Sequence, residues 1–142
     1  MYKTAEFDEP VDGIIYATAA GLGYAAMLNI LFVINSGGVD LGAGVIRITV
    51  TSLAHASFAG VIGYFLGLEK FQNRPYWYTS LGVVIAAVLN GIFFTLRTVV
   101  TGGGLSEANL WLGLILAAIL AGGTTYFLST AINRQLTARG AK

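Results

Sequence analysis

The sequence contains no cysteine, a single histidine and only two prolines in 142 residues. The lack of cysteine excludes disulfides, thiolate metal sites and cysteine nucleophiles. Charge is scarce as well, because Asp, Glu, Lys and Arg make up 11% of the chain, whereas soluble domains carry about a quarter. This composition argues against a soluble domain, and the net charge of +1 gives no reason to expect nucleic acid as a partner.

Apolar residues make up 56% of the chain and are concentrated in four long stretches without a charged side chain. A helix needs about 20 mostly apolar residues to cross the hydrocarbon core of a bilayer, and each stretch supplies them. None of the stretches alternates apolar and polar residues as a transmembrane strand would. We therefore predict an all-α integral membrane protein, a bundle of four transmembrane helices that forms one domain. The predicted spans are residues 13–35, 48–68, 75–96 and 108–133.

The segments between the predicted spans carry charged residues and residues that end or begin helices. Gly37 and Gly38 are expected to end the first helix, followed by a flexible loop through residues 40–47. Pro75 is expected to open the third helix, and Ser106 to cap the fourth after a run of three glycines. The acidic segment before the first span differs from the basic start of a signal peptide, so we expect that span to remain in the protein.

The basic residues are unevenly divided between the two sides of the membrane. Four spans place both termini and the middle connection on one side. The other side carries only Arg47 and Arg97, so the basic excess predicts cytoplasmic termini. The first side carries Lys3, Lys70, Arg74, Arg134, Arg139 and Lys142.

Small residues recur at intervals of four on three of the predicted helices. In lipid, helices associate through close backbone approach, and such rows mark the faces that approach one another. We expect these rows to pack the bundle, with subunit contacts as the alternative. The rows consist of Ala17, Gly21 and Ala25; Ser52, Ala56 and Gly60, with Gly63 and Gly67 as a further pair; and Gly113, Ala117 and Ala121.

His55 is the one ionisable residue inside a predicted span, and Asn29 and Asn90 are uncharged polar residues of neighbouring spans. An ionisable group at this depth is a candidate for function, since histidine ligates metals and pigments and relays protons. No second His, Cys, Asp or Glu lies within a metal-ligand spacing on its helix. We therefore expect no metal and no resident cofactor, with lipid or pigment in the grooves between helices as the alternative. A hydrogen bond to another helix is the expected role of His55.

Two blocks of sequence carry a family resemblance. The first comprises residues 7–16, the run Gly21-Leu22-Gly23-Tyr24-Ala25-Ala26 and residues 29–31. The second comprises Arg47, the run His55-Ala56-Ser57-Phe58-Ala59-Gly60 and residues 63–71. In order, spacing and helix position they resemble the core of PrsW-type intramembrane proteases, bacterial relatives of the type II CAAX prenyl endopeptidases. The resemblance extends over about residues 6–96 and implies a bacterial inner membrane.

The resemblance also implies where catalytic groups would stand. Such proteases are expected to carry a Glu-Glu-x-x-Lys helix, an aromatic-x-x-x-Glu motif, a lone helical histidine and a late His-Gly-x-x-Asp or Asn motif. Here Leu28 stands at the glutamate, Asn90 at the late histidine and Phe94 at the acid, while His55 is retained. Leucine and phenylalanine neither ligate metals nor transfer protons.

These departures lead to the expectation that the chain is no enzyme. We predict a PrsW-like pseudoprotease without catalytic residues, an accessory or structural subunit that binds other integral membrane subunits and lipids. Three alternatives stay open: a regulator that binds transmembrane peptides without cleavage, a residual intramembrane metallopeptidase, and a pigment- or cofactor-binding protein that uses His55.

Overall fold

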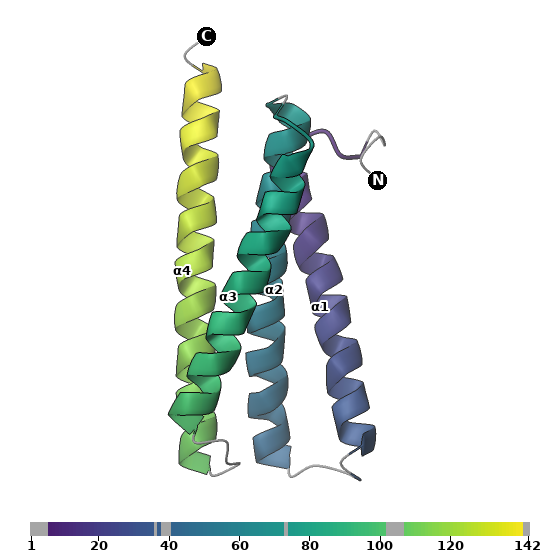
Figure 1. The fold of residues 1–142 in the computed structure, drawn as a ribbon, viewed down its shortest axis with the longest axis vertical. Coiled ribbons are helices and arrows are strands. Elements are labelled where there is room, and N and C mark those ends of the chain that lie inside the picture. The colour runs from purple at the N-terminus through teal and green to yellow at the C-terminus, as the bar shows by residue number, and fades with distance from the viewer. Residues whose placement is uncertain (1–5, 36, 38–40, 73, 102–106, 141–142) are drawn as a thin grey trace.

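A computed structural model describes residues 6–35, 37, 41–72, 74–101 and 107–140, apart from the side chains of residues 100, 101, 107–110 and 135–140. It contains four antiparallel helices, which are α1 (Pro10–Asn35), α2 (Leu41–Phe71), α3 (Trp77–Thr101) and α4 (Glu107–Gly140) (Figure 1). All four are long and apolar enough to cross a membrane, and the described residues form no strand. The prediction of an all-α membrane protein with four transmembrane helices is confirmed.

Helix α2 is the central element of the bundle. Helices α1, α3 and α4 all pack on α2, and α3 also contacts α4. In Figure 1, α1 and α4 lie on opposite sides of α2, and α3 crosses in front. The start of α1, the end of α4 and the α2–α3 connection lie at one end of the bundle. The end of α1, the start of α2, the end of α3 and the start of α4 lie at the other end.

The predicted boundaries differ most where a charged residue was taken as the end of a span. Helix α2 begins at Leu41, inside the segment predicted to be a flexible loop, and α3 continues four residues past Arg97 to Thr101. A single charge does not break a helix when its long side chain packs on apolar surface. Arg47 does so, because its guanidinium carbon lies 3.5 Å from the centre of the Phe32 ring.

Of the other boundaries only the end of α4 shifts as far as the start of α2, and two predicted features lie beyond the described part of the chain. Helix α1 begins at Pro10 instead of residue 13, and α3 begins at Trp77, two residues after Pro75. Helix α4 begins at Glu107 and extends to Gly140, beyond the predicted end at 133. The expected glycine loop and the expected Ser106 cap fall in residues 102–106, outside the described residues.

Polar contacts fix the end of the bundle where α1 begins. Asp12 accepts hydrogen bonds from the backbone N–H groups of Asp8 and Glu9, at 3.0 and 2.7 Å, so its carboxylate holds the first turn of α1. The Lys70 ammonium donates to the carbonyl of Phe7, whose ring is buried. Glu69 accepts a hydrogen bond from the backbone N–H of Thr79 at 3.0 Å, within the first turn of α3.

Glycines allow α1 and α2 to touch backbone to backbone. A Cβ on Gly13 would lie 2.5 Å from the carbonyl oxygen of Gly63, and a Cβ on Gly67 would lie 2.5 Å from that of Pro10. About two turns further along α1, a Cβ on Gly21 would lie 2.6 Å from the Cβ of Ala59. Real Cβ atoms do not come this close to other atoms. Glycine is therefore required at the α1–α2 crossing.

The remaining small residues of the predicted rows also face other helices or lie partly covered. Gly60 faces two helices, since a Cβ there would lie 3.2 Å from Leu128 of α4 and 3.4 Å from Thr18 of α1. Ala25, Gly113 and Ala117 are buried, and Ala17, Ser52, Ala56 and Ala121 are half-buried. Whether any of these residues also contacts a second subunit stays a prediction.

Many hydroxyl groups of the helices donate hydrogen bonds to carbonyl groups of their own helix, whereas the buried Thr79 hydroxyl has no partner within the described residues. Thr51 donates to Arg47 at 2.9 Å, and Ser57 donates to Leu53 at 2.8 Å. The same arrangement occurs at Thr49, Thr95, Thr98, Thr124, Ser129 and Thr130.

Substitution of Gly63 by alanine tests the α1–α2 crossing. We expect Gly63→Ala to destabilise the bundle by about 1–3 kcal/mol, because the new methyl group collides with the backbone of Gly13. Gly23→Ala is the matched control, since nothing lies within 4 Å of its Cβ position, and alanine there is expected to be neutral or to stabilise by up to about 1 kcal/mol. Unfolding in detergent by SDS titration measures both. Equal stabilities would contradict the close crossing.

Candidate active-site cavity

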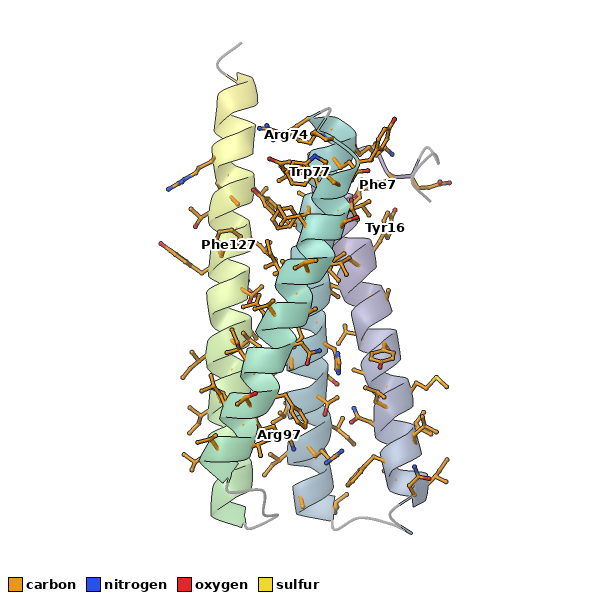
Figure 2. All side chains as sticks on the ribbon, in the orientation of Figure 1. Phe7, Tyr16, Arg74, Trp77, Arg97 and Phe127 are labelled. Carbon is orange, nitrogen blue, oxygen red and sulfur yellow. The ribbon has the colours of Figure 1, made fainter. Side chains whose placement is uncertain are left out.

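A cavity of about 230 Å³ opens between α1, α2 and α3. It lies toward the end of the bundle where α1 ends and α2 begins. Arg97, one of its lining residues, lies far from Phe7 and Trp77 at the other end (Figure 2). The lining residues are Leu28 and Asn29 of α1; Arg47, Val50, Thr51, Ala54, His55 and Phe58 of α2; and Asn90, Phe93, Phe94 and Arg97 of α3.

The cavity brings together every position that the family resemblance singled out. Leu28, His55, Asn90 and Phe94 come from three helices and all line it. Their proximity is a finding of the structure, because the sequence places them up to 66 residues apart. Phe94 is 64% exposed and only partly faces the cavity.

His55 lies half-buried on the α2 wall. Its ring contacts Tyr24 of α1 edge to face, with 5.2 Å between ring centroids, and Phe58 of its own helix at 6.4 Å. The expected hydrogen bond to another helix is not found among the residues that the structure describes. The imidazole nitrogens are therefore not engaged by the described part of the chain, and the ring is held by aromatic packing.

Two buried donors of the cavity lining have no acceptor within the described part of the chain. Asn29 is only 6% exposed, and its amide nitrogen Nδ2 makes no hydrogen bond. The Nε of Arg47 is buried and unpaired in the same way. Leaving a buried donor unpaired costs about 1–3 kcal/mol. Both groups are therefore suited to donate to a bound molecule.

Sequence reasoning did not place Arg47 and Arg97 in the site. Arg47 was treated as part of the matched pattern and of a loop, Arg97 as lying beyond the end of a span, and both were counted for the orientation of the chain. A usable signal was present, since the first lies near the start of α2 and the second near the end of the antiparallel α3. Such positions come to the same end of a bundle.

The described residues do not fit a metal ion. Catalytic zinc is held by three protein ligands, usually His, Glu, Asp or Cys. No group of three such residues lies together in the described part of the chain, and His55 is the one member of this class in the cavity. The described carboxylates of Asp12 and Glu69 lie at the opposite end of the bundle, beside the start of α1 and the end of α2.

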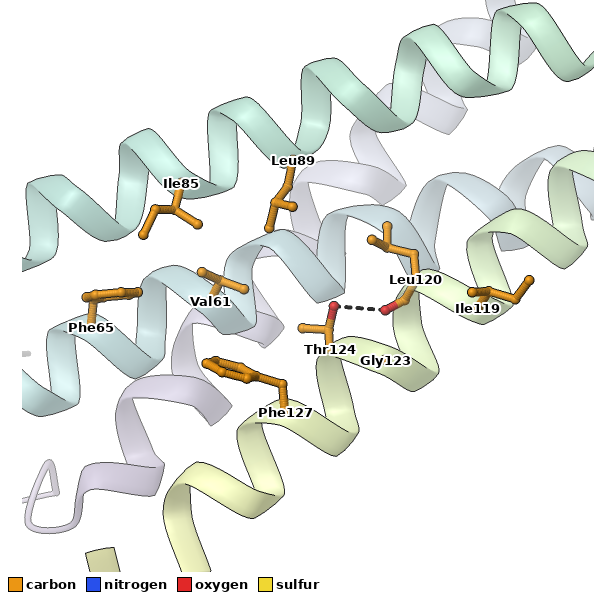
Figure 3. Close-up of a pocket in the computed structure, with 9 residues that line it drawn as sticks. All are labelled: Val61, Phe65, Ile85, Leu89, Ile119, Leu120, Gly123, Thr124 and Phe127. Carbon is orange, nitrogen blue, oxygen red and sulfur yellow. Dashed lines mark hydrogen bonds between the residues drawn. The ribbon is translucent and has the colours of Figure 1, made fainter. Parts of the chain in front are cut away.

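A second cavity, of about 430 Å³, lies between α2, α3 and α4 (Figure 3). Its walls are almost entirely carbon, from residues such as Phe65, Ile85 and Phe127. The Thr124 hydroxyl in its wall donates to the carbonyl of Leu120 at 2.8 Å. This cavity accommodates apolar groups and offers no group for catalysis.

Comparison with known proteins identifies the family. The model of the PrsW family intramembrane metalloprotease matches residues 1–122. The chain belongs to the PrsW family. It is similar to proteins named protease PrsW from Geobacillus kaustophilus (30% identity), Clostridioides difficile (32%) and Bacillus subtilis (32%). Each alignment covers 66% of this chain and 40%, 41% and 42% of the respective relative.

The chain thus spans about two fifths of the length of these PrsW relatives. The resemblance inferred from the two sequence blocks is confirmed by the family match. No solved structure matches the chain.

The prediction of a non-catalytic accessory subunit, and with it that of a chain that is no enzyme, is wrong by these comparisons. The family is described as a metalloprotease family and the relatives are named proteases, while nothing points to an accessory subunit or a pseudoprotease. The error was to equate altered side chains at Leu28, Asn90 and Phe94 with loss of the family's function. The family match extends over all three positions.

Introducing metal-ligating side chains at Leu28 and Asn90 tests whether these positions lie close to His55. We expect the double variant Leu28→Glu with Asn90→His to bind one Zn²⁺ per chain, because with His55 it would hold a His₂Glu set. The unaltered chain, with one such group in the cavity, is expected to bind far less. Metal content after dialysis, measured by plasma mass spectrometry, compares the two. A double variant that stays free of zinc would show that the three side chains do not meet.

Proposed function

We propose that this PrsW-family chain serves the hydrolysis of peptide bonds within the membrane and that its α1–α2–α3 cavity holds the peptide. The observation that carries the proposal is the cavity itself. It is lined by the positions matched to the family, and its histidine lies near the middle of the 31-residue α2. Family membership supports hydrolysis as the reaction.

The side chains of the cavity suggest distinct roles in such a reaction. Neutral His55 accepts a proton from water, as the one group of the cavity lining suited to this near neutral pH. The unpaired amide of Asn29 donates a hydrogen bond to a peptide carbonyl oxygen. The positive charges of Arg47 and Arg97 favour the negative charge that develops on that oxygen. No role is assigned to a metal, since the described residues provide one ligand.

We also propose that both termini face the cytoplasm in a bacterial inner membrane. The basic residues support this orientation, because six of the eight lie on the side of the termini. The matched relatives are bacterial. The cavity, at the opposite end of the bundle, then opens toward the outer half of the bilayer.

Replacement of His55 tests the proposed chemistry. We expect His55→Gln to lower the rate of cleavage of a single-span membrane peptide by about 10²- to 10⁴-fold, since glutamine cannot accept the proton. Ser129→Ala, at an exposed hydroxyl of α4, is the control and should leave the rate unchanged. The rate is measured on purified protein in lipid nanodiscs by gel analysis of the products. Equal rates for His55→Gln and the unaltered chain would refute the role of His55.

Reporter fusions test the orientation. A green fluorescent protein fused after Lys142 is expected to fluoresce, and alkaline phosphatase at the same place is expected to be inactive, because both report a cytoplasmic end. Fusions after Gly38, in the α1–α2 connection, are the matched control and should give the reverse pattern. Active phosphatase at Lys142 would overturn the proposed orientation.

A further inference from the structure

Two arginines share the cavity without a carboxylate beside them in the described part of the chain. Arg47 of α2 and Arg97 of α3 both line it, and their positive charges repel one another. Neither forms an ion pair with a described residue. Like charges that face one cavity in a membrane protein are costly unless an anion joins them.

The cavity also presents buried hydrogen-bond donors without acceptors. The amide nitrogen of Asn29, on a side chain 6% exposed, and the Nε of Arg47 are both unpaired within the described residues. Together with the guanidinium of Arg97 they supply donors from three helices. Every group in this set donates, and an oxyanion is the ligand that accepts from all of them.

The arginines lie near the ends of their helices, where lipid headgroups are expected. Arg47 is six residues from the start of α2 and Arg97 is four residues from the end of α3. At 1.5 Å per residue these positions are about 9 and 6 Å inside the helix ends, close to the interface of a bilayer. Guanidinium groups bind phosphate through paired hydrogen bonds.

We propose that the end of this cavity nearest the α1–α2 connection binds a phosphate group, presented by the headgroup of an anionic phospholipid. Arg47 and Arg97 hold the phosphate oxygens and Asn29 donates from α1, so that the lipid joins all three helices at this end. The proposal concerns binding alone and does not depend on peptide hydrolysis, although a bound phosphate would compete with a peptide for these same donors. Its failure and that of the proposed function are therefore separate results.

The carboxylates nearest in sequence to Arg47 and Arg97 compete with a phosphate as a source of negative charge. Asp40 precedes α2, and Glu107 begins α4 after the connection from α3. The side chains of both lie outside the described part of the chain. If one of them neutralises the arginines, the unaltered chain will bind no phosphate, which is one outcome of the experiment.

The test is titration of the purified 142-residue chain in neutral detergent with short-chain phosphatidylglycerol, followed by calorimetry. We expect saturable binding that weakens about tenfold in Arg97→Gln and in Arg47→Gln, because each loses a charged hydrogen bond. Arg134→Gln removes an exposed arginine of α4 and is the matched control, with unchanged affinity. Asn29→Asp keeps the shape of the side chain but adds a negative charge, and should abolish binding.

Two further ligands distinguish a lipid headgroup from free phosphate as the source of the bound phosphate group. Short-chain phosphatidylcholine, with its compensating positive charge, is expected to bind more weakly than phosphatidylglycerol. Inorganic phosphate of equal affinity would support the phosphate site and overturn the lipid as its source. Absence of saturable binding to the unaltered chain, or equal affinity in Arg97→Gln and Arg134→Gln, would overturn the proposal. Elution volume and helical circular dichroism identify variants that misfold. If Arg97→Gln misfolds, Arg97→Lys, which keeps the charge, takes its place.

Discussion

The arrangement of the bundle depends on the backbone contact between α1 and α2 at Gly13, Gly63 and Gly67. Helix α1 packs chiefly on α2, so this contact and the close approach of Gly21 to Ala59 set its angle. The helices touch at the end where α1 begins and separate toward the other end (Figure 1). The cavity lies in that widening space, with Asn29 on its α1 wall. A tight crossing at one end thus creates the site at the other.

The sequence was sufficient for the fold class because the bilayer imposes a strong and simple constraint. Four charge-free stretches of sufficient length admit few arrangements other than four helices. The ends of the helices were harder to predict, because charged residues were taken as the ends of the membrane-spanning segments. Arg47 lies more than a full turn inside α2, where its guanidinium packs on the ring of Phe32, a contact between helices that a single-sequence pattern does not contain.

The site was only partly accessible from sequence. Family resemblance singled out Leu28, His55, Asn90 and Phe94, but their meeting in one cavity depends on crossing angles that periodicity does not determine. Arg97 was missed for the same reason. Function was misjudged on different grounds: the presence or absence of single ligands was weighed above the pattern of residues 1–122, which places the chain in the PrsW family.

The hydroxyl groups of the spans have a consequence for assembly. Because Thr51, Ser57, Thr95 and Thr124 are already satisfied by their own helices, each span enters the bilayer with these groups complete. These hydroxyl groups therefore require no partner from a neighbouring helix, whereas the buried donors of Asn29 and Arg47 remain unpaired within the described residues. We expect α1 and α2 to associate through the close approach of their glycine faces and not through these hydroxyl groups.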